Sequence, residues 1–202
     1  MAVAATTELE AINIMLAAIG ESPVNTLTGT LPADVVMARS TLTEVNKEVQ
    51  SEGWSFNTET DLTLTRDGSN QISLPANVLR VDANIHQHPT IDPIQRGLKL
   101  YDRQNNKYEF DEDLICTVVY FREFNEITEQ ARRYINIKAA RVFVDRLIGD
   151  QGLRTYTQED ETRARAILTE SDYANADHNL LRGDPSLTSI FDTYNPSSAL
   201  IR

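Results

Sequence analysis

The sequence contains little cysteine, little histidine and little positive charge. Cys116 is the single cysteine in 202 residues, which excludes a disulfide within the chain and a zinc site built on several thiolates. Lys and Arg number 19 against 30 Asp and Glu, so the net charge is −11. Because nucleic acids are held mainly by Lys and Arg, an acidic chain is a poor candidate for gripping DNA. It suits a surface that DNA slides past.

Long apolar runs are also missing. No segment approaches the roughly 18 apolar residues that cross a bilayer. The first five residues lack the basic region of a signal peptide, and Glu8 and Glu10 follow them. Hydrophobic residues still make up 41% of the chain, which is enough for a folded core. The sequence therefore predicts a protein that folds in a reducing cytoplasm and has no membrane partner.

Helical patterns occupy the two ends of the chain. Thr7 and Glu10 have the spacing of a capping box and open a helix that ends at Gly20. A second amphipathic helix is predicted from about Pro32 to Gly53. A long helix follows from about Thr128 to Ile148, and a last one runs from Thr157 to about Ala176.

The middle of the chain has the period of β-strands. Strands are predicted around residues 62–64, 72–74 and 78–83, and the strongest one spans 114–121. Residues 98–101 and 108–110 bracket a polar run and are typical of a hairpin, whereas 86–97, rich in proline, is predicted as loop or edge.

These segregated blocks predict an α+β fold. Residues 1–56 and 125–182 would form a helical bundle domain, and residues 57–124 an inserted antiparallel β domain. Residues 183–202 are polar and interrupted by proline, and are expected to form an extended C-terminal tail.

The long helix is the predicted subunit interface. Its apolar residues fall into two stripes, and a helix that is apolar on more than one side needs more than one packing partner. The second partner could be a neighbouring subunit, which makes the candidate interface residues Ile137, Arg141, Val144 and Ile148. The helix is also locally basic, with Arg132, Arg133, Lys138, Arg141 and Arg146. These cations could pair with the acidic start of the last helix or across a subunit boundary.

The tail is the second candidate contact. It is too poor in apolar surface to fold alone but carries enough to dock on another surface. The residues expected to dock are Leu187, Ile190, Phe191, Tyr194, Leu200 and Ile201.

No convincing catalytic, cofactor or metal site is present. The sequence contains neither a phosphate-binding loop nor a nucleophile elbow. His86 and His88 could share a metal, but solvated loop histidines are the simpler interpretation. Residues 111–113 are expected to form an acidic turn rather than a cation site. Glu123, Glu126 and Glu129 could serve glycoside hydrolysis, but acids at a helix start need no such role.

Several motifs, in order, resemble the tail tubular protein A family of short-tailed phages. The resemblance covers about residues 8–183, and its most specific part is at the N-terminus. The motifs are Ala11–Val24, Thr26–Leu27, Ala33–Asp34, Ala38–Arg39, Leu42, Val45, Val49–Gln50, Gly53–Asn57, Tyr101–Arg103, Arg133–Tyr134 and Lys138–Phe143.

The resemblance implies a structural adaptor of the virion tail rather than an enzyme. In this family a dodecameric ring joins the portal to the tubular nozzle (the tail tubular protein B type), lines the channel for DNA ejection, and has tail fibres attached nearby. Such a protein is made in the host cytoplasm and touches passing DNA without binding it specifically. The rival interpretation is a virion-associated hydrolase of glycan or peptidoglycan.

Overall fold

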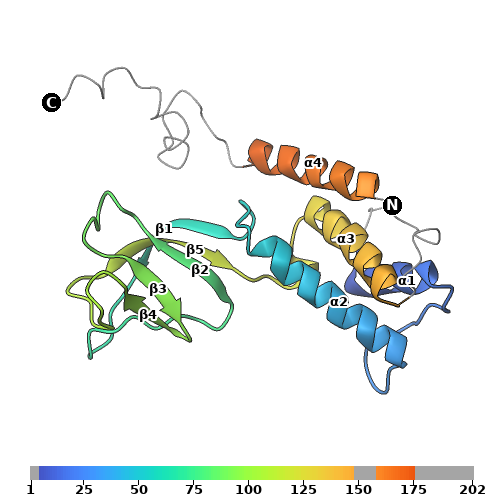
Figure 1. The fold of residues 1–202 in the computed structure, drawn as a ribbon, viewed down its shortest axis with the longest axis horizontal. Helices are drawn as coiled ribbons and strands as arrows, with labels where there is room; N and C mark the ends of the chain where they lie inside the picture. The colour runs from blue at the N-terminus through green and yellow to red at the C-terminus, as the bar shows by residue number, and fades with distance from the viewer. Residues whose placement is uncertain (1–4, 148–157, 176–202) are drawn as a thin grey trace.

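The computed structural model describes residues 5–147 and 158–175 of the chain. The described part has a helical lobe at one end and a β lobe at the other (Figure 1), which confirms the α+β class. In chain order its elements are α1 (Glu8–Ala18), α2 (Ala33–Gln50), β1 (Thr58–Leu64), β2 (Val78–Ala83), β3 (Pro93–Arg96), β4 (Lys99–Asp102), β5 (Leu114–Tyr120), the 3₁₀ turn η1 (Phe124–Glu126), α3 (Glu129–Leu147) and α4 (Gln158–Asn175).

The ends of α1 and α2 follow from local chemistry. Thr7 Oγ1 accepts a hydrogen bond from the Glu10 amide, and Glu10 Oε2 accepts one from the Thr7 amide, so the predicted capping box is present. Gly20 follows α1 with a φ of +81°, a conformation that costs glycine little. Pro32 caps α2, where its missing N–H removes no helical hydrogen bond.

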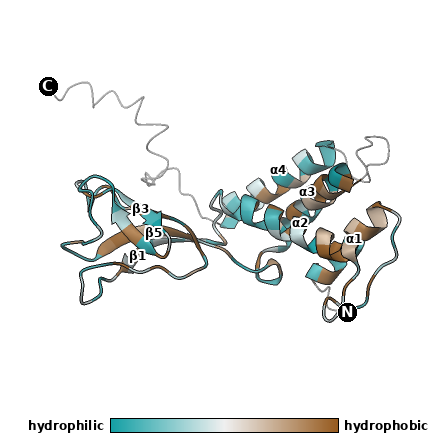
Figure 2. Cartoon of the chain, turned by 60° about the horizontal axis from the view of Figure 1, so that its bottom comes forward, coloured by the Kyte–Doolittle hydropathy of each residue, from teal (hydrophilic) through white to brown (hydrophobic). Residues whose placement is uncertain are grey.

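Helix α3 lies at the centre of the helical lobe. It packs against α1, α2 and α4, and its buried residues join those of the other three helices in one hydrophobic cluster. In Figure 2 the apolar colouring of these helices is concentrated where they face one another. The buried apolar residues of α3 thus pack against three helices of the same chain.

The β lobe has two layers. Strand β5 is central in an antiparallel sheet of order β1–β5–β2. The β3–β4 hairpin lies over this sheet (Figures 1 and 2) and is extended by bridges from β4 to Ser73 and from Gln71 to Glu109. Side chains from both layers form a second hydrophobic cluster, which includes Leu100, Phe110 and Cys116.

The strand pairing of the second layer differs from the sequence prediction. Lys99–Asp102 pairs with Pro93–Arg96, and the predicted hairpin across the polar run is reduced to one antiparallel bridge between Asp102 and Lys107. Gly97, with a φ of +63°, forms the tight turn between the two strands. The region predicted as loop or edge therefore contains a strand, and Pro93 is tolerated because it begins that strand.

The joint between the lobes is built from buried amides. Asn57 Nδ2 donates to the carbonyls of Gln50 and Tyr120 at 3.0 and 2.8 Å, and its Oδ1 accepts from the Trp54 amide. Gln50 Nε2 donates to the Arg122 carbonyl at 2.8 Å. One set of side chains thus ties the end of α2 to both chain segments that connect the lobes.

Gly53 allows this joint to be tight. Its φ is +83°, and an added Cβ would lie 2.9 Å from Arg80 Nη2 and 3.3 Å from Val119 Cγ2. A side chain at this position would be strained and would crowd the outer face of the sheet.

Candidate assembly surfaces

The residues predicted to form the subunit interface are mostly inside the protomer. Ile137 and Val144 are 5% and 1% exposed, and Ile137 belongs to the helical-lobe cluster. Ile148 lies outside the described residues. Burial within the chain leaves Ile137 and Val144 little surface to offer a neighbour, and Ile137 packs in the bundle itself.

Arg141 is also engaged within the chain. Its Nε donates to Glu161 Oε2 at 2.6 Å, and its Nη1 lies 3.4 Å from Asp145 Oδ2. Both partners of the Arg141–Glu161 pair are mostly shielded from solvent. This bond joins α3 to the acidic start of α4, as one of the two alternatives predicted.

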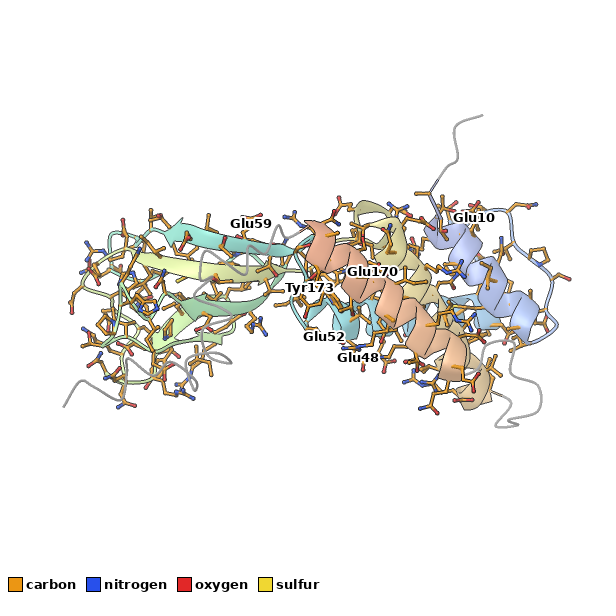
Figure 3. All side chains as sticks on the ribbon, turned by 90° about the horizontal axis from the view of Figure 1, so that it is seen from above. Glu10, Glu48, Glu52, Glu59, Glu170 and Tyr173 are labelled. Carbon is orange, nitrogen blue, oxygen red and sulfur yellow. The ribbon has the colours of Figure 1, made fainter. Side chains whose placement is uncertain are left out.

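Three glutamates spaced four residues apart, two in α2 and one in the turn just after it, hold further cations of the bundle. Glu44 accepts two hydrogen bonds from Arg146, at 2.6 and 2.8 Å. Glu48 pairs with Lys138 at 3.0 Å, and Glu52 with Arg165 of α4 at 2.5 Å. Glu48 and Glu52 are labelled beside α4 in Figure 3. Because residues four apart share one face of a helix, Glu44 and Glu48 lie on one side of α2, and Glu52 lies in the turn that follows it.

Arg132 of α3 binds backbone oxygens instead of a carboxylate. Its guanidinium donates to the carbonyls of Thr6, Asn125 and Ile127. Pairing within the chain is thus confirmed for Lys138, Arg141 and Arg146, although the partners include α2 as well as α4. Arg133 is exposed.

The carboxylates that could have served hydrolysis have structural partners. Glu123 and Glu126 form a capping box around η1. Glu129 accepts hydrogen bonds from the amide and the hydroxyl of Thr6, at 2.8 and 2.7 Å. These three acids fix the entry to α3 and the start of the chain's described part.

His88 is not a solvated loop histidine, contrary to the default expectation. It is 6% exposed, its Nε2 accepts from the Ile115 amide at 3.0 Å, and its Nδ1 lies 2.7 Å from Glu112 Oε1. Since Nε2 accepts, Nδ1 carries the proton and donates to Glu112. His86 is exposed. The loop is fixed by one buried histidine, and the two histidines do not act as a pair.

The acidic turn at residues 111–113 is confirmed as a structural feature. Asp111 pairs with Lys107, Glu112 with His88, and Asp113 with Arg66. Across the described ranges, 5–147 and 158–175, no group of three or more His, Cys, Asp or Glu could hold a metal ion.

The hollows of the surface do not resemble ligand pockets. A hollow of about 620 Å³ is lined by residues of α2 alone, among them Val36, Arg39 and Thr43, so it is a depression along one helix. A smaller one of about 320 Å³ lies beside Asp102 in the β lobe. The carboxylate of Asp102 is already used, because it accepts from the amides of Asp92, Gln104 and Asn105 and from the Asn105 side chain.

The outer face of the β3–β4 layer is apolar, aromatic and basic. Pro93, Leu100 and Asp102 are buried, so strand alternation turns Ile94, Arg96, Lys99 and Tyr101 outward. Leu98, at the turn, is 56% exposed. We call this surface the basic face; it consists of Ile94, Arg96, Leu98, Lys99, Tyr101 and Tyr108.

The outer face of the β1–β5–β2 sheet has the opposite charge. Val81 and Ala83 belong to the core of the lobe, so Asp82 points outward between them and is exposed. Asp61, at a β-bulge with a φ of +54°, accepts from the Asn84 side chain at 3.3 Å. Ile85 follows at 70% exposed. We call Asp61, Asp82 and Ile85 the acidic face.

Comparison with known proteins identifies the family. The family described as tail tubular protein matches the chain over residues 9–178. The chain is also 32% identical over 166 residues to tail tubular protein A of Klebsiella phage KP34, an alignment that covers 81% of this chain and 86% of that protein. The chain belongs to the tail tubular protein family.

As a tail tubular protein, the chain is a structural component of a phage tail. The family match runs through both lobes and includes every described helix and strand except the first residue of α1. Within the described residues no helix is long and apolar enough to cross a membrane.

The six tail residues predicted to dock, from Leu187 to Ile201, lie outside the described residues. The two charged faces of the β lobe were not predicted. Strand alternation could have indicated Asp82, but a bulge at Asp61 and the pairing of Pro93–Arg96 with Lys99–Asp102 depend on contacts that the local pattern does not contain.

Proposed function

We propose that this tail tubular protein forms a ring, expected to be dodecameric, that joins the portal to the tail nozzle of a short-tailed phage. The observation that carries the proposal is the family match over residues 9–178, which includes both lobes. The motifs in the sequence point the same way, since they are spread over the helical lobe and the β lobe. An adaptor must engage one ring above it and another below it, and a two-lobed subunit suits that task.

The joint between the lobes supports a role that needs a fixed subunit shape. Gln50 and Asn57 are both buried and hydrogen-bonded to the backbone on each side of the β lobe's connection. A fully satisfied buried polar network fixes one geometry, because any rotation leaves polar groups without partners. The two ends of each subunit then keep a constant spacing around the ring.

The acidic balance suits a channel wall for DNA. At −11 per chain, a ring of such subunits repels phosphates, so a genome can slide past without being retained. Most bundle cations described above are neutralised by glutamates of the same chain and are not free to bind DNA.

The partners we propose are the portal, the nozzle protein and, near the nozzle, the tail fibres. We keep the tail from residue 183 to 202 as the docking segment for the portal or an adjacent subunit, through Leu187, Ile190, Phe191 and the other apolar residues named above. Deleting residues 183–202 should abolish portal binding while the circular dichroism spectrum is retained. Unchanged binding would contradict this assignment.

Negative-stain imaging of the purified chain, alone and mixed with portal, tests the ring directly. Closed rings that stack on the portal are the expected result. A chain that stays monomeric with portal present would overturn the proposal. A wall-clearing assay on the same preparation tests the hydrolase alternative, which no feature of the described residues favours.

A further inference from the structure

The two outer faces of the β lobe are complementary. The basic face presents Arg96 and Lys99, and the acidic face presents Asp61 and Asp82. In the described part of the chain none of these four side chains forms a salt bridge. Each face also exposes aliphatic side chains, Ile94 and Leu98 on one and Ile85 on the other.

We propose that the basic face of one copy packs against the acidic face of the next copy, so that the β lobes form a continuous belt. The inference rests on the proposed ring and specifies one of its contacts. The occupant of each face is a second copy of this chain.

The position of the two faces fits a head-to-tail contact. The β3–β4 layer covers one side of the β1–β5–β2 sheet (Figure 1). Because Val81 and Ala83 belong to the core between the layers, strand alternation turns Asp82 to the other side. A subunit with complementary patches on opposite sides can repeat the same contact around a ring. Two identical patches would instead give a two-fold dimer.

The basic face is held in place before any partner arrives. The Arg96 guanidinium carbon lies 3.6 Å from the centre of the Tyr101 ring, and Tyr108 meets that ring edge-on at 4.9 Å. Lys99 Nζ donates to Gln71 Oε1 at 2.7 Å. Tyr and Arg are enriched at the energetic centres of interfaces, and side chains that are already ordered lose less entropy on binding.

Other charges border these faces, including the ion pairs Arg103–Asp92 and Arg122–Glu59. Arg80 lies on the acidic side, but its Nη2 is next to Gly53, at the end nearest the helical lobe. Glu109 lies beside the basic face and is 3.4 Å from the Gln71 amide.

Charge exchange in the full-length chain tests the contact. One variant carries Arg96→Glu with Lys99→Glu. The other carries Asp82→Lys with Asp61→Asn, because asparagine tolerates the positive φ at that bulge. Each variant alone should lose rings, with the concentration for half-assembly raised by about tenfold or more, since like charges then face each other or attraction is lost.

Mixing the two variants supplies the decisive control. A face made acidic in one variant then meets a face made basic in the other, so a 1:1 mixture should recover assembly by mass photometry. Rings of the Arg96/Lys99 variant at wild-type concentrations, or a mixture that does not recover, would overturn the inference and leave the proposed ring intact. Wild-type chain that stays monomeric with portal would instead overturn the ring and the belt together.

A cross-link gives a readout that does not depend on weakened assembly. Asp82→Cys combined with Lys99→Cys should give a ladder of covalent oligomers under mild oxidation, whereas either single variant should give none. A ladder confined to dimers would contradict the head-to-tail contact.

Discussion

Gln50 holds the backbone of Arg122 at both of its polar groups. Its Nε2 donates to the Arg122 carbonyl, and its Oε1 accepts from the Arg122 amide, each at 2.8 Å. Gln50 is fully buried at the end of α2, and Arg122 follows β5. Two residues 72 apart thus form a backbone-like pairing that closes the joint between the lobes.

Removing this side chain should destabilise the whole chain. Gln50→Ala leaves the Arg122 amide without its partner and opens a cavity, and we expect a loss of about 2 to 4 kcal/mol in the free energy of unfolding. Urea denaturation measures the loss. Gln130→Ala, at an exposed position of α3, is the matched control and should change stability by less than about 0.5 kcal/mol. Equal stability of the two variants would show that the joint does not depend on Gln50.

The two histidines of one loop should behave differently. His88→Ala removes the acceptor for the Ile115 amide and the donor to Glu112, so we expect a loss of about 2 to 3 kcal/mol in the free energy of unfolding. His86→Ala, two residues away and exposed, should cost less than about 0.5 kcal/mol. Thermal melts of the two variants side by side check this contrast, and similar melting temperatures would refute it.

Asp102 should make the β lobe sensitive to acid. Burial by itself raises the pKa of Asp102, but the hydrogen bonds from Asn105, Asp92 and Gln104 outweigh it and hold the pKa below the ordinary value. A carboxyl whose pKa is lower in the folded state contributes stability above its unfolded pKa, about 3.9. That contribution is lost as the pH falls through the folded value.

Denaturation curves between pH 7 and pH 2 test this prediction. Asp102→Asn should lower stability at pH 7 and flatten its decline toward acid. Asp111→Asn, at an almost fully exposed position, should keep the wild-type pH profile. An Asp102→Asn profile parallel to the wild type would contradict the assignment.

The helices were predictable because their signals are local. Thr7, Glu10 and Gly20 define α1 within a few residues, and the spacing of apolar residues defines α2 and α3. The strand Leu114–Tyr120 was equally clear, since it is rich in β-branched and aromatic residues, of which Val118 and Val119 are buried.

The second layer of the β lobe was not predictable in the same way. Lys99–Asp102 carries no signal that selects Pro93–Arg96 over residues 108–110 as its partner; pairing is decided by which side chains reach the shared core. The role of His88 depends on Glu112 and Ile115, which approach only after the lobe has folded. The same holds for the proposed assembly surfaces, because the positions of Asp82 and Lys99 depend on how the two layers pack.

The long helix gives the clearest lesson about assembly surfaces. The two apolar stripes of α3 predict a neighbouring subunit on one of them, but Ile137 and Val144 are buried within their own chain. A Val144→Asp variant would therefore place a charge at a fully buried position and unfold the bundle. Loss of assembly in such a variant would not report on an interface, whereas exposed positions such as Arg96 can.

Cys116 should be inert in the folded chain and reactive only after unfolding. It is completely buried at the centre of β5, and burial, together with the nearby charge of Asp82, raises the pKa of its thiol to about 12. The reactive thiolate is therefore almost absent at pH 8. Ellman's reagent should label no thiol in native protein and one thiol per chain in urea. Rapid labelling of the native chain would contradict this burial. The absence of labelling in native wild type also serves as a control for the cross-link. In a chain with cysteines at positions 82 and 99, covalent oligomers would then arise from the introduced pair and not from Cys116.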